Sequence, residues 1–330
     1  QALAVSRANG VDIDDPRVSV EVSFGVDGQG NHTVTMTARR PMRTALMKLL
    51  GQHTVDVASS ATAVVPPIDL VLVVDQSTSL RDMGAWRPLQ DAVKDLVMHF
   101  DDDLDQVGLV SFGVRATHRH QLGSGFAQDI REAVDRMNPI YWTNAAEGLR
   151  LAHQQITGPN ARDHAIKVVI FFTDGQPTAA RTSVGGRDRI ITARDRDPSG
   201  RTIGGYYNDP DRIPLDRPIG SHGCRTGEER IFCPTWTEAG PGPHGPVARR
   251  LARAQTLGRA AQIRGADVFV YTIGLGNPNA SNPHMRADTG LLKLISNEQE
   301  IASADQPRGR SYFAPSVAEL RQVFRQVAQD

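Results

Sequence analysis

The sequence predicts an α/β protein with a mostly parallel sheet covered by helices on both faces, preceded by a smaller β-rich domain. Two continuous apolar runs, "IDLVLVVD" at 68–75 and "IKVVIFFTD" at 166–174, have the length of strands buried on both faces. Segments with apolar residues at helical spacing separate such runs. Residues 18–63 instead alternate apolar and polar residues with a period of two, as half-buried antiparallel strands do.

The N-terminal domain is expected to cover residues 1–66. Its strands are "VSVEVSF", "HTVTMTA" and "TVDVASSATAV", and "GVDGQGNH" between the first two is a turn in which glycine supplies the unusual backbone angles. The segment 42–51, "MRTALMKLLG", indicates a short amphipathic helix stopped by Gly51. The prolines of "VVPP" at 64–67 mark the domain boundary, because consecutive prolines continue neither a sheet nor a helix.

The second domain is expected to cover residues 67–330, where strand and helix patterns alternate with one interruption. Apolar spacing and the capping-box pair of Ser316 and Glu319 give the bounds of its elements. The expected strands are 68–75, 106–112, an edge strand at 115–122, 166–174, 266–274 and 310–315. The expected helices are 86–100, 126–137, 144–156, 247–264, 291–296 and 316–328.

The interruption is a segment at 179–245 that is dense in Gly, Pro, Asp and Arg, and it is interpreted as an insertion with short elements of its own. Its interleaved Arg and Asp residues are typical of a solvated, salt-bridged surface, with a partner-binding surface as the alternative. The two cysteines of the chain, Cys224 and Cys233, lie here. A disulfide between them would pin the insertion, stabilise by about 3 kcal/mol and indicate an extracytoplasmic protein. The alternative is two unrelated thiols.

Composition argues against several classes of function. The 330 residues carry equal numbers of acidic and basic side chains, so the formal net charge is zero, and no long block of one sign occurs. A surface for nucleic acid or anionic membrane is therefore not expected. No apolar run approaches the roughly 20 residues of a transmembrane helix. Because the chain begins at Gln1 without a signal peptide, we interpret it as an excised or processed piece.

Carboxyl and hydroxyl side chains follow two of the expected buried strands. Asp75, Ser77 and Ser79 come at the end of the first, Asp174 comes at the end of the second, and Thr143 opens the helix that leads to the second. In open α/β sheets, ligands bind beyond the carboxyl ends of the strands, near the switch point of strand order. All five groups are hard oxygen donors without Cys or clustered His, which favours Mg²⁺ over Zn²⁺ or copper. One of six coordination positions then stays open for an anionic ligand, such as a Glu or Asp of a partner protein.

These residues resemble the metal-ion-dependent adhesion site (MIDAS) of von Willebrand factor A (vWA) domains. "VVDQSTS" fits the D-x-S-x-S motif, "TNAAEGL" resembles the second metal loop and "FFTDGQP" the third. The resemblance runs from residue 67 to the C-terminus, apart from the insertion, and implies a Rossmann-like, six-stranded sheet. It implies that Ser77, Ser79 and Thr143 bind the ion directly, and that Asp75 and Asp174 act directly or through water. The implied ion is Mg²⁺, with Mn²⁺ or Ca²⁺ as alternatives.

One departure from the vWA pattern lies directly before Thr143. Many relatives have two glycines at these positions, whereas this chain has Tyr141 and Trp142. The bulky aromatic side chains are expected either to cover the site or to offer a contact surface. The departure therefore bears on ligand access rather than on metal binding.

The segment before the vWA-like domain, from "VSVEV" to "SATAVVPP", resembles TadG-type proteins of the TadE/TadG group, which are linked to Flp (tight adherence) pili. This resemblance implies an extracytoplasmic bacterial protein of the cell surface, pilus or periplasm. It also implies a membrane-anchoring N-terminal helix absent from this chain. The implied role is a minor-pilin-like or assembly component whose partner is a pilus subunit, another assembly protein or a host surface protein.

The leading prediction is a non-enzymatic adhesion and assembly module, and three alternatives stand beside it. A vWA scaffold with a structural or vestigial metal site would bind partners through its insertion. A metal-assisted hydrolase would use Ser77 or a metal-bound water as nucleophile. No catalytic His motif accompanies "DQSTS", and His118, His120 and His153 are interpreted as structural or solvated. A cytoplasmic, chaperone-like vWA protein would carry free thiols at both cysteines.

Overall fold

The computed structural model divides the chain into two compact units, Gln1–Pro67 (unit 1) and Ile68–Asp330 (unit 2). The residues that the structure describes are 15, 17–28, 31–45, 47–51, 53–184, 187–193, 195–196, 202–203, 206–207, 244–276, 287–298 and 303–328.

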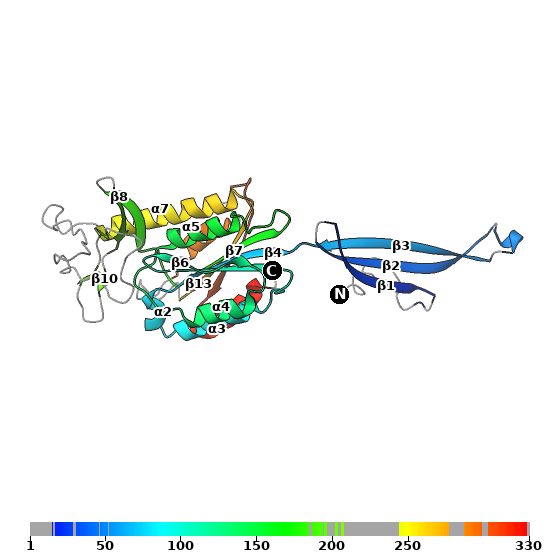
Figure 1. The fold of residues 1–330 in the computed structure, drawn as a ribbon, viewed down its shortest axis with the longest axis horizontal. Coiled ribbons are helices and arrows are strands. Elements are labelled where there is room, and N and C mark those ends of the chain that lie inside the picture. Colours follow the sequence, from blue (N-terminus) through cyan, green and yellow to red (C-terminus); the bar gives the residue numbers. More distant parts are fainter. Residues whose placement is uncertain are drawn as a thin grey trace. The chain divides into compact units, whose positions relative to one another are not determined.

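Unit 1 contains a three-stranded antiparallel sheet. Its strands, in the spatial order β1-β2-β3, are β1 (Ser19–Val26), β2 (His32–Arg43) and β3 (Thr54–Val65). Figure 1 shows them side by side as one layer. Their period-two alternation therefore gives the strands that the sequence predicts, and β1 and β2 pair as consecutive antiparallel strands.

The helix predicted at 42–51 is wrong. β2 continues through Arg43, and only a short 3-10 helix, η1 (Met47–Leu50), follows it. Backbone pairing with β3, which joins Met42 to Val55, replaces the first helical turn. A helix this short is marginal without packing, and in the described structure no residue of η1 is buried. Gly51 does end this segment, at a φ of 81° that favours glycine.

Unit 2 is built on a six-stranded sheet with the order β14-β13-β7-β4-β5-β6. All neighbouring strands are parallel except β5 and β6, which are antiparallel. This confirms the predicted α/β fold and the mostly parallel sheet. The strands are β4 (Ile68–Asp75), β5 (Gln106–Phe112), β6 (Ala116–Gly123), β7 (Ile166–Thr173), β13 (Phe269–Leu275) and β14 (Ser311–Ala314).

Helices cover both faces of this sheet (Figure 1). On one face lie α3 (Trp86–Val97), α4 (Ala127–Asp135) and α9 (Leu320–Val327), the last preceded by the 3-10 helix η4 (Val317–Glu319) with its predicted capping box. On the other lie α5 (Ala145–Ile156), α7 (His244–Arg264) and α8 (Thr289–Ser296). A five-residue helix, α2 (Thr78–Asp82), follows β4 and was not predicted.

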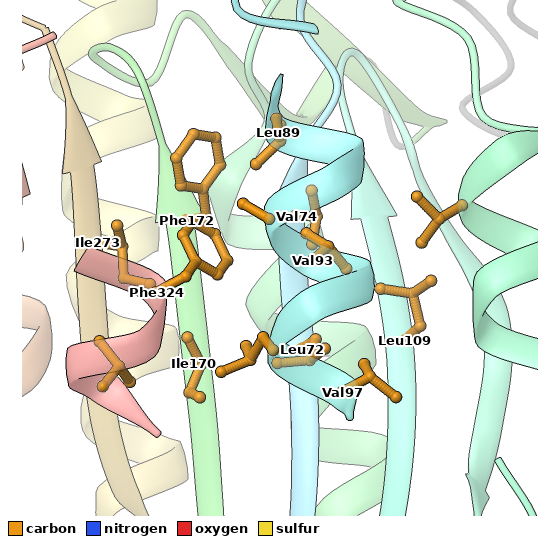
Figure 2. Packing of buried hydrophobic residues seen from close by; sticks show 14 of the residues in the cluster. Leu72, Val74, Leu89, Val93, Val97, Leu109, Ile170, Phe172, Ile273 and Phe324 are labelled. Atoms are coloured by element: carbon orange, nitrogen blue, oxygen red, sulfur yellow. The ribbon is translucent and has the colours of Figure 1, made fainter. Parts of the chain in front are cut away.

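Alternate residues of the central strands divide between two hydrophobic cores. Leu72 and Val74 of β4 point to the α3 side, where Figure 2 shows them packed with Phe172 of β7 and Phe324 of α9. Val73, between them in β4, points to the opposite core under α5. Because both faces are covered, the strand reads as one continuous apolar run.

The described part of the segment 179–245 contains short strands. β8 (Ala179–Val184) and β9 (Arg187–Thr192) form an antiparallel hairpin that β12 (Tyr206–Tyr207) extends, and β10 (Asp195–Arg196) pairs with β11 (Thr202–Ile203). Cys224 and Cys233 lie outside the described residues, so the disulfide stays a prediction. None of the described helices combines the length and apolar character needed to cross a membrane.

The order of the strands in the sheet determines where the candidate site lies. From β4 the chain proceeds to β5 and β6 on one side, and later to β7, β13 and β14 on the other. The order therefore reverses between β4 and β7, and the residues at the carboxyl ends of these two strands face a common crevice.

Candidate metal centre

Asp75 is the last residue of β4 and is fully buried. Its Oδ1 accepts a hydrogen bond of 2.7 Å from the backbone N–H of Ser77, and its Oδ2 accepts one of 2.6 Å from the Thr173 hydroxyl. Thr173 ends β7, so these bonds fix the carboxylate across the switch point. Thr173 was not predicted as part of the site, although a hydroxyl residue directly before Asp174 in "FFTDG" is a signal that the sequence offers.

The serine hydroxyls of the first loop do not cap a helix. Ser77 occupies the N-cap position of α2, yet its side chain makes no capping hydrogen bond. Its Oγ lies 2.9 Å from the Oγ of Ser79 and donates to Oδ1 of Asp174 at 3.3 Å. A serine at this position ordinarily uses its hydroxyl on the helix backbone. Here the hydroxyl is instead directed at the buried carboxylate.

Asp174 follows β7 and is 1% exposed. Its Oδ2 is buried and has no hydrogen-bond partner among the described residues. A buried polar atom without a partner is costly, and a carboxylate oxygen especially so. A divalent cation is the group that two adjacent carboxylates and two hydroxyls would satisfy, so the residues present fit the implied metal.

The two carboxyl groups share one desolvated environment. Burial, and then the charge of Asp174, hold the pKa of Asp75 above its ordinary value, against the hydrogen bonds from Thr173 and Ser77. Burial likewise raises the pKa of Asp174, against the hydrogen bonds from Ser79 and Ser77. Without a cation, the site therefore favours protonation over two adjacent negative charges.

Thr143 lies in the neighbouring loop and is 6% exposed. Its backbone N–H donates to Oγ1 of Thr178 at 2.9 Å, and its carbonyl accepts from the Thr178 N–H at 2.9 Å. The N–H of Ile140, three residues earlier, donates to the carbonyl of Gln76 at 2.7 Å and joins this loop to the first one. In the described structure, hydrogen bonds link Asp75, Asp174 and the two serines, but none links the Thr143 side chain to them.

Gly113 allows these loops to approach. A Cβ built on it would lie 2.1 Å from Cγ1 of Ile140, so any side chain would push the second loop away. The Gly113 carbonyl also accepts a hydrogen bond of 2.7 Å from the N–H of Asn144, directly after Thr143. The role of this glycine was not predicted, because nothing in the sequence pairs it with Ile140.

The bulky residue before Thr143 does not form a contact surface. Trp142 is 6% exposed and packs with Val114, Ala179 and Ile190, and its Nε1 donates to the carbonyl of Ala193 at 3.2 Å. Its φ of 57° lies in the left-handed region, which costs a residue other than glycine about 1–2 kcal/mol. Burial of the indole against Ala179 of β8 and Ile190 of β9 offsets this cost.

His118 and His120, which a hydrolase could use as a base, make their hydrogen bonds with residues other than Ser77. Nδ1 of His118 contacts Nε2 of Gln155 at 2.8 Å, and Nδ1 of His120 contacts the Val107 carbonyl at 3.0 Å. Burial lowers the pKa of His118 and of His153. Among the hydrogen bonds of the described residues, none joins a histidine to Ser77. The described residues also contain no group of three or more His, Cys, Asp or Glu side chains placed to bind a metal.

A comparison with protein families decides the fold. Residues 69–197 match the model of the von Willebrand factor type A domain. Unit 2 has the vWA fold. The first and third metal-loop motifs, with Asp75 and Asp174, lie within the matched residues of this vWA domain, as does Thr143.

Solved structures of pilus proteins share this fold. The vWF domain of the type V pili tip protein Mfa5 from Porphyromonas gingivalis has a TM-score of 0.51 and 16% identity, covering 81% of this chain and 95% of that one. The PilB minor pilin from Streptococcus sanguinis has a TM-score of 0.51 and 14% identity, covering 94% and 77%. At these identities the likeness concerns the fold alone.

Other structural matches are longer proteins. Proximal thread matrix protein 1 from the mussel byssus, in a structure with a zinc-occupied MIDAS motif, has a TM-score of 0.46 and 19% identity, over 80% of this chain and 45% of that one. This chain spans 34 to 46% of the length of several such structures. No curated protein matches the chain.

The raised pKa values of Asp75 and Asp174 predict how the free energy of unfolding depends on pH when a chelator keeps the site free of metal. Between the ordinary carboxyl pKa of about 4 and the raised folded values, the folded state binds more protons than the unfolded chain. The free energy of unfolding should therefore fall as pH rises through this interval. We expect the free energy of unfolding to fall less steeply with pH in Asp75→Asn than in the wild type. Saturating Mg²⁺ should oppose the fall in the wild type. Both effects are measured by urea unfolding at several pH values. Parallel pH profiles for the wild type and the variant in chelator would contradict the assignment.

Proposed function

We propose that the vWA domain of this chain is a metal-dependent adhesion module that captures a carboxylate of a partner protein. Asp75, Ser77, Ser79, Thr143 and Asp174 would hold Mg²⁺, with Mn²⁺ or Ca²⁺ as alternatives. The observation that carries the proposal is the pair of buried carboxylates with two serine hydroxyls directed toward them and one carboxylate oxygen left without a partner.

The hydroxyl and carboxylate residues would have different roles in such a site. The hydroxyls of Ser77, Ser79 and Thr143 would supply neutral oxygen ligands, while Asp75 and Asp174 would balance the charge of the ion. When bound, the ion supplies a Lewis-acidic position that an external carboxylate can fill. Thr173 and the Ser77 N–H hold Asp75 in one orientation, which is the role of outer partners in metal sites.

Binding is favoured over catalysis by the surroundings of Ser77. Its hydroxyl is committed to Ser79 and Asp174, and no described histidine lies within hydrogen-bond reach to act as its base. The similar folds of Mfa5 and PilB are those of pilus proteins, which supports adhesion at a cell surface.

The finer assignment concerns the biological setting. We propose an extracytoplasmic component of a bacterial tight-adherence (Flp/Tad) pilus, TadG-like, anchored in the full-length protein by an N-terminal membrane helix. The resemblance of the segment before β4 to TadG-type proteins supports it. A disulfide between Cys224 and Cys233 belongs to this proposal, and thiol labelling of the native protein tests it: labelled cysteines would favour a cytoplasmic protein.

The adhesion function is tested with an array of Asp- and Glu-containing peptides, each also synthesised with the acidic residue replaced by its amide. We expect binding of acidic peptides in Mg²⁺ that is lost in chelator, with the amide forms and with Ser79→Ala. An array on which binding is equal with and without chelator would contradict a metal-dependent site. It would favour the alternative of a scaffold that binds through its insertion.

A further inference from the structure

Thr143, one of the proposed metal ligands, is held by different contacts from the carboxylates and serines of the site. Those groups are hydrogen-bonded to one another. Thr143 is bonded through its backbone to Thr178: its N–H donates to Oγ1 of Thr178 at 2.9 Å, and its carbonyl accepts from the N–H of Thr178 at 2.9 Å. Thr178 follows Asp174 in the third metal loop. Two bonds in opposite directions therefore join the second metal loop to the third.

The same contacts continue into the hairpin β8–β9. The carbonyl of Thr178 accepts a hydrogen bond of 2.6 Å from the N–H of Ala193, which extends the antiparallel ladder of the hairpin by one pair. The N–H of Ala179, the first residue of β8, donates to the Thr143 carbonyl at 3.2 Å. The indole of Trp142 donates to the Ala193 carbonyl at 3.2 Å. The hairpin thus bonds directly to residues 142 and 143.

An ion pair attaches the hairpin at a second point. β8 lies beside α5 (Figure 1), and Nε and Nη2 of Arg181 each donate to a carboxylate oxygen of Glu147 at 3.2 Å. The Glu147 side chain is 7% exposed and also accepts from Arg150 at 3.0 Å. Burial raises the pKa of Glu147, but the hydrogen bonds and charges of Arg150 and Arg181 outweigh it and lower the pKa, so the carboxylate stays charged. The pair ties β8 to the first turn of the helix that follows Thr143.

The backbone next to Thr143 requires such support. Trp142 has a φ of 57°, in the left-handed region that disfavours residues with a side chain. A strained residue persists only where its surroundings hold it. The indole is buried against Ala179 and Ile190 of the hairpin. Since Trp142 directly precedes Thr143, the contacts that hold Trp142 also fix the backbone from which the Thr143 side chain projects.

We propose that Thr178 and the hairpin β8–β9 position Thr143 so that its hydroxyl can bind the cation, and that the hairpin thereby regulates the metal centre. The proposal rests on the proposed function of this site. A ligand that is already in place loses less freedom when the metal binds, so the docked hairpin raises the metal affinity. Such coupling is reciprocal, and Mg²⁺ should stabilise the docked hairpin to the same extent. A partner that holds the hairpin in place would strengthen metal binding without touching the ion.

Calorimetric titration of the whole chain with Mg²⁺ tests Thr178. Thr178→Val keeps the shape of the side chain but removes Oγ1, the acceptor of the Thr143 N–H. We expect the Mg²⁺ dissociation constant to rise at least about 10-fold, as is usual for loss of an outer partner, and Thr178→Ser to stay within about 3-fold of the wild type. Thr256→Val is the matched control, because it removes a buried threonine hydroxyl that donates to the Ala252 carbonyl within α7. It should leave the dissociation constant unchanged.

Hydrogen exchange measures the coupling from the side of the hairpin. In the wild type, Mg²⁺ should slow amide exchange in β8 and β9. In chelator, Thr178→Val should speed exchange of the Thr143 N–H, a readout that needs no metal. Arg181→Met should weaken Mg²⁺ binding, although residue 181 lies outside the metal loops. Arg150→Met is its matched control: it removes the other arginine of Glu147 but leaves the ion pair of the hairpin, so it should bind Mg²⁺ as the wild type does.

These measurements separate failure of the positioning role from failure of the metal site. A wild type that binds no Mg²⁺ would contradict the proposed function, and the role of Thr178 with it. Wild-type binding with unchanged affinity in Thr178→Val, equal weakening by Thr178→Val and Thr178→Ser, or equal effects of Arg181→Met and Arg150→Met would overturn the positioning role alone. Circular dichroism of each variant checks that the fold is retained.

Discussion

Replacing Asp75 by asparagine is expected to abolish binding of Mg²⁺ at millimolar concentrations while leaving the fold intact. The change removes one of two charges that balance the ion, and loss of even an outer partner typically costs about 10–100-fold in metal affinity. The wild type should gain melting temperature on addition of Mg²⁺, because the ion binds only the folded state. The variant should show no gain.

The stability of the Asp75→Asn variant in chelator is a second test of the site. In the wild type, two buried carboxyl groups face one shared environment without an opposite charge, so the asparagine variant should be at least as stable in chelator. Asp82→Asn is the control, because Asp82 lies on α2 nearby with its side chain 61% exposed. Its calorimetric Mg²⁺ affinity should equal that of the wild type. Unchanged affinity in Asp75→Asn would contradict the site.

Replacing Arg162 by methionine is expected to destabilise the vWA domain by about 3–5 kcal/mol, because the buried Asp69 carboxylate then loses its charged partner and keeps only the hydrogen bond of 2.7 Å from the backbone N–H of residue 162. The Asp69 side chain at the start of β4 is fully buried and accepts from Nε of Arg162 at 2.8 Å. The guanidinium also donates to the carbonyls of Leu104 and Ile68, at 2.8 and 3.0 Å. Methionine retains an apolar stem, so the loss reports chiefly on these bonds.

Arg136→Met is the matched control for this stability measurement. Its ion pair with Glu132 lies 3.3 Å apart, but the Arg136 side chain is 70% exposed, so its loss should cost less than about 1 kcal/mol. In the Arg162 variant, the melting temperature should fall by roughly 10 °C, and adding Asp69→Asn should recover part of the loss. Equal effects of the two arginine substitutions in urea unfolding would contradict a stabilising role for the buried pair.

The vWA fold was predictable from the sequence because local patterns coincide with the final packing. The apolar run of β4 reflects two cores, and the paired Ser316 and Glu319 form the expected capping box. The prediction of a helix at 42–51 was wrong because the amphipathic pattern of this segment carries no information about β3, the strand with which it pairs. Only the pairing of Met42 with Val55 decides between helix and sheet.

The residue types of the candidate site could also be named in advance, but their supports could not. Asp75, Ser77, Ser79 and Asp174 meet because β4 and β7 are neighbours, which the strand order implies. The close approach at Gly113 depends on contacts between distant segments that leave no local signature. The burial of Trp142 likewise depends on the hairpin that begins 37 residues later at Ala179, a partner found only in three dimensions.

The most direct measurement is anomalous diffraction from crystals of the chain grown with Mn²⁺, which substitutes for Mg²⁺ at oxygen sites. We predict one strong peak beside the hydroxyls of Ser77, Ser79 and Thr143, about 2.0–2.3 Å from its oxygen ligands, with one coordination position held by water or an anion. A map with no peak there, or with the manganese bound only elsewhere, would contradict the adhesion site.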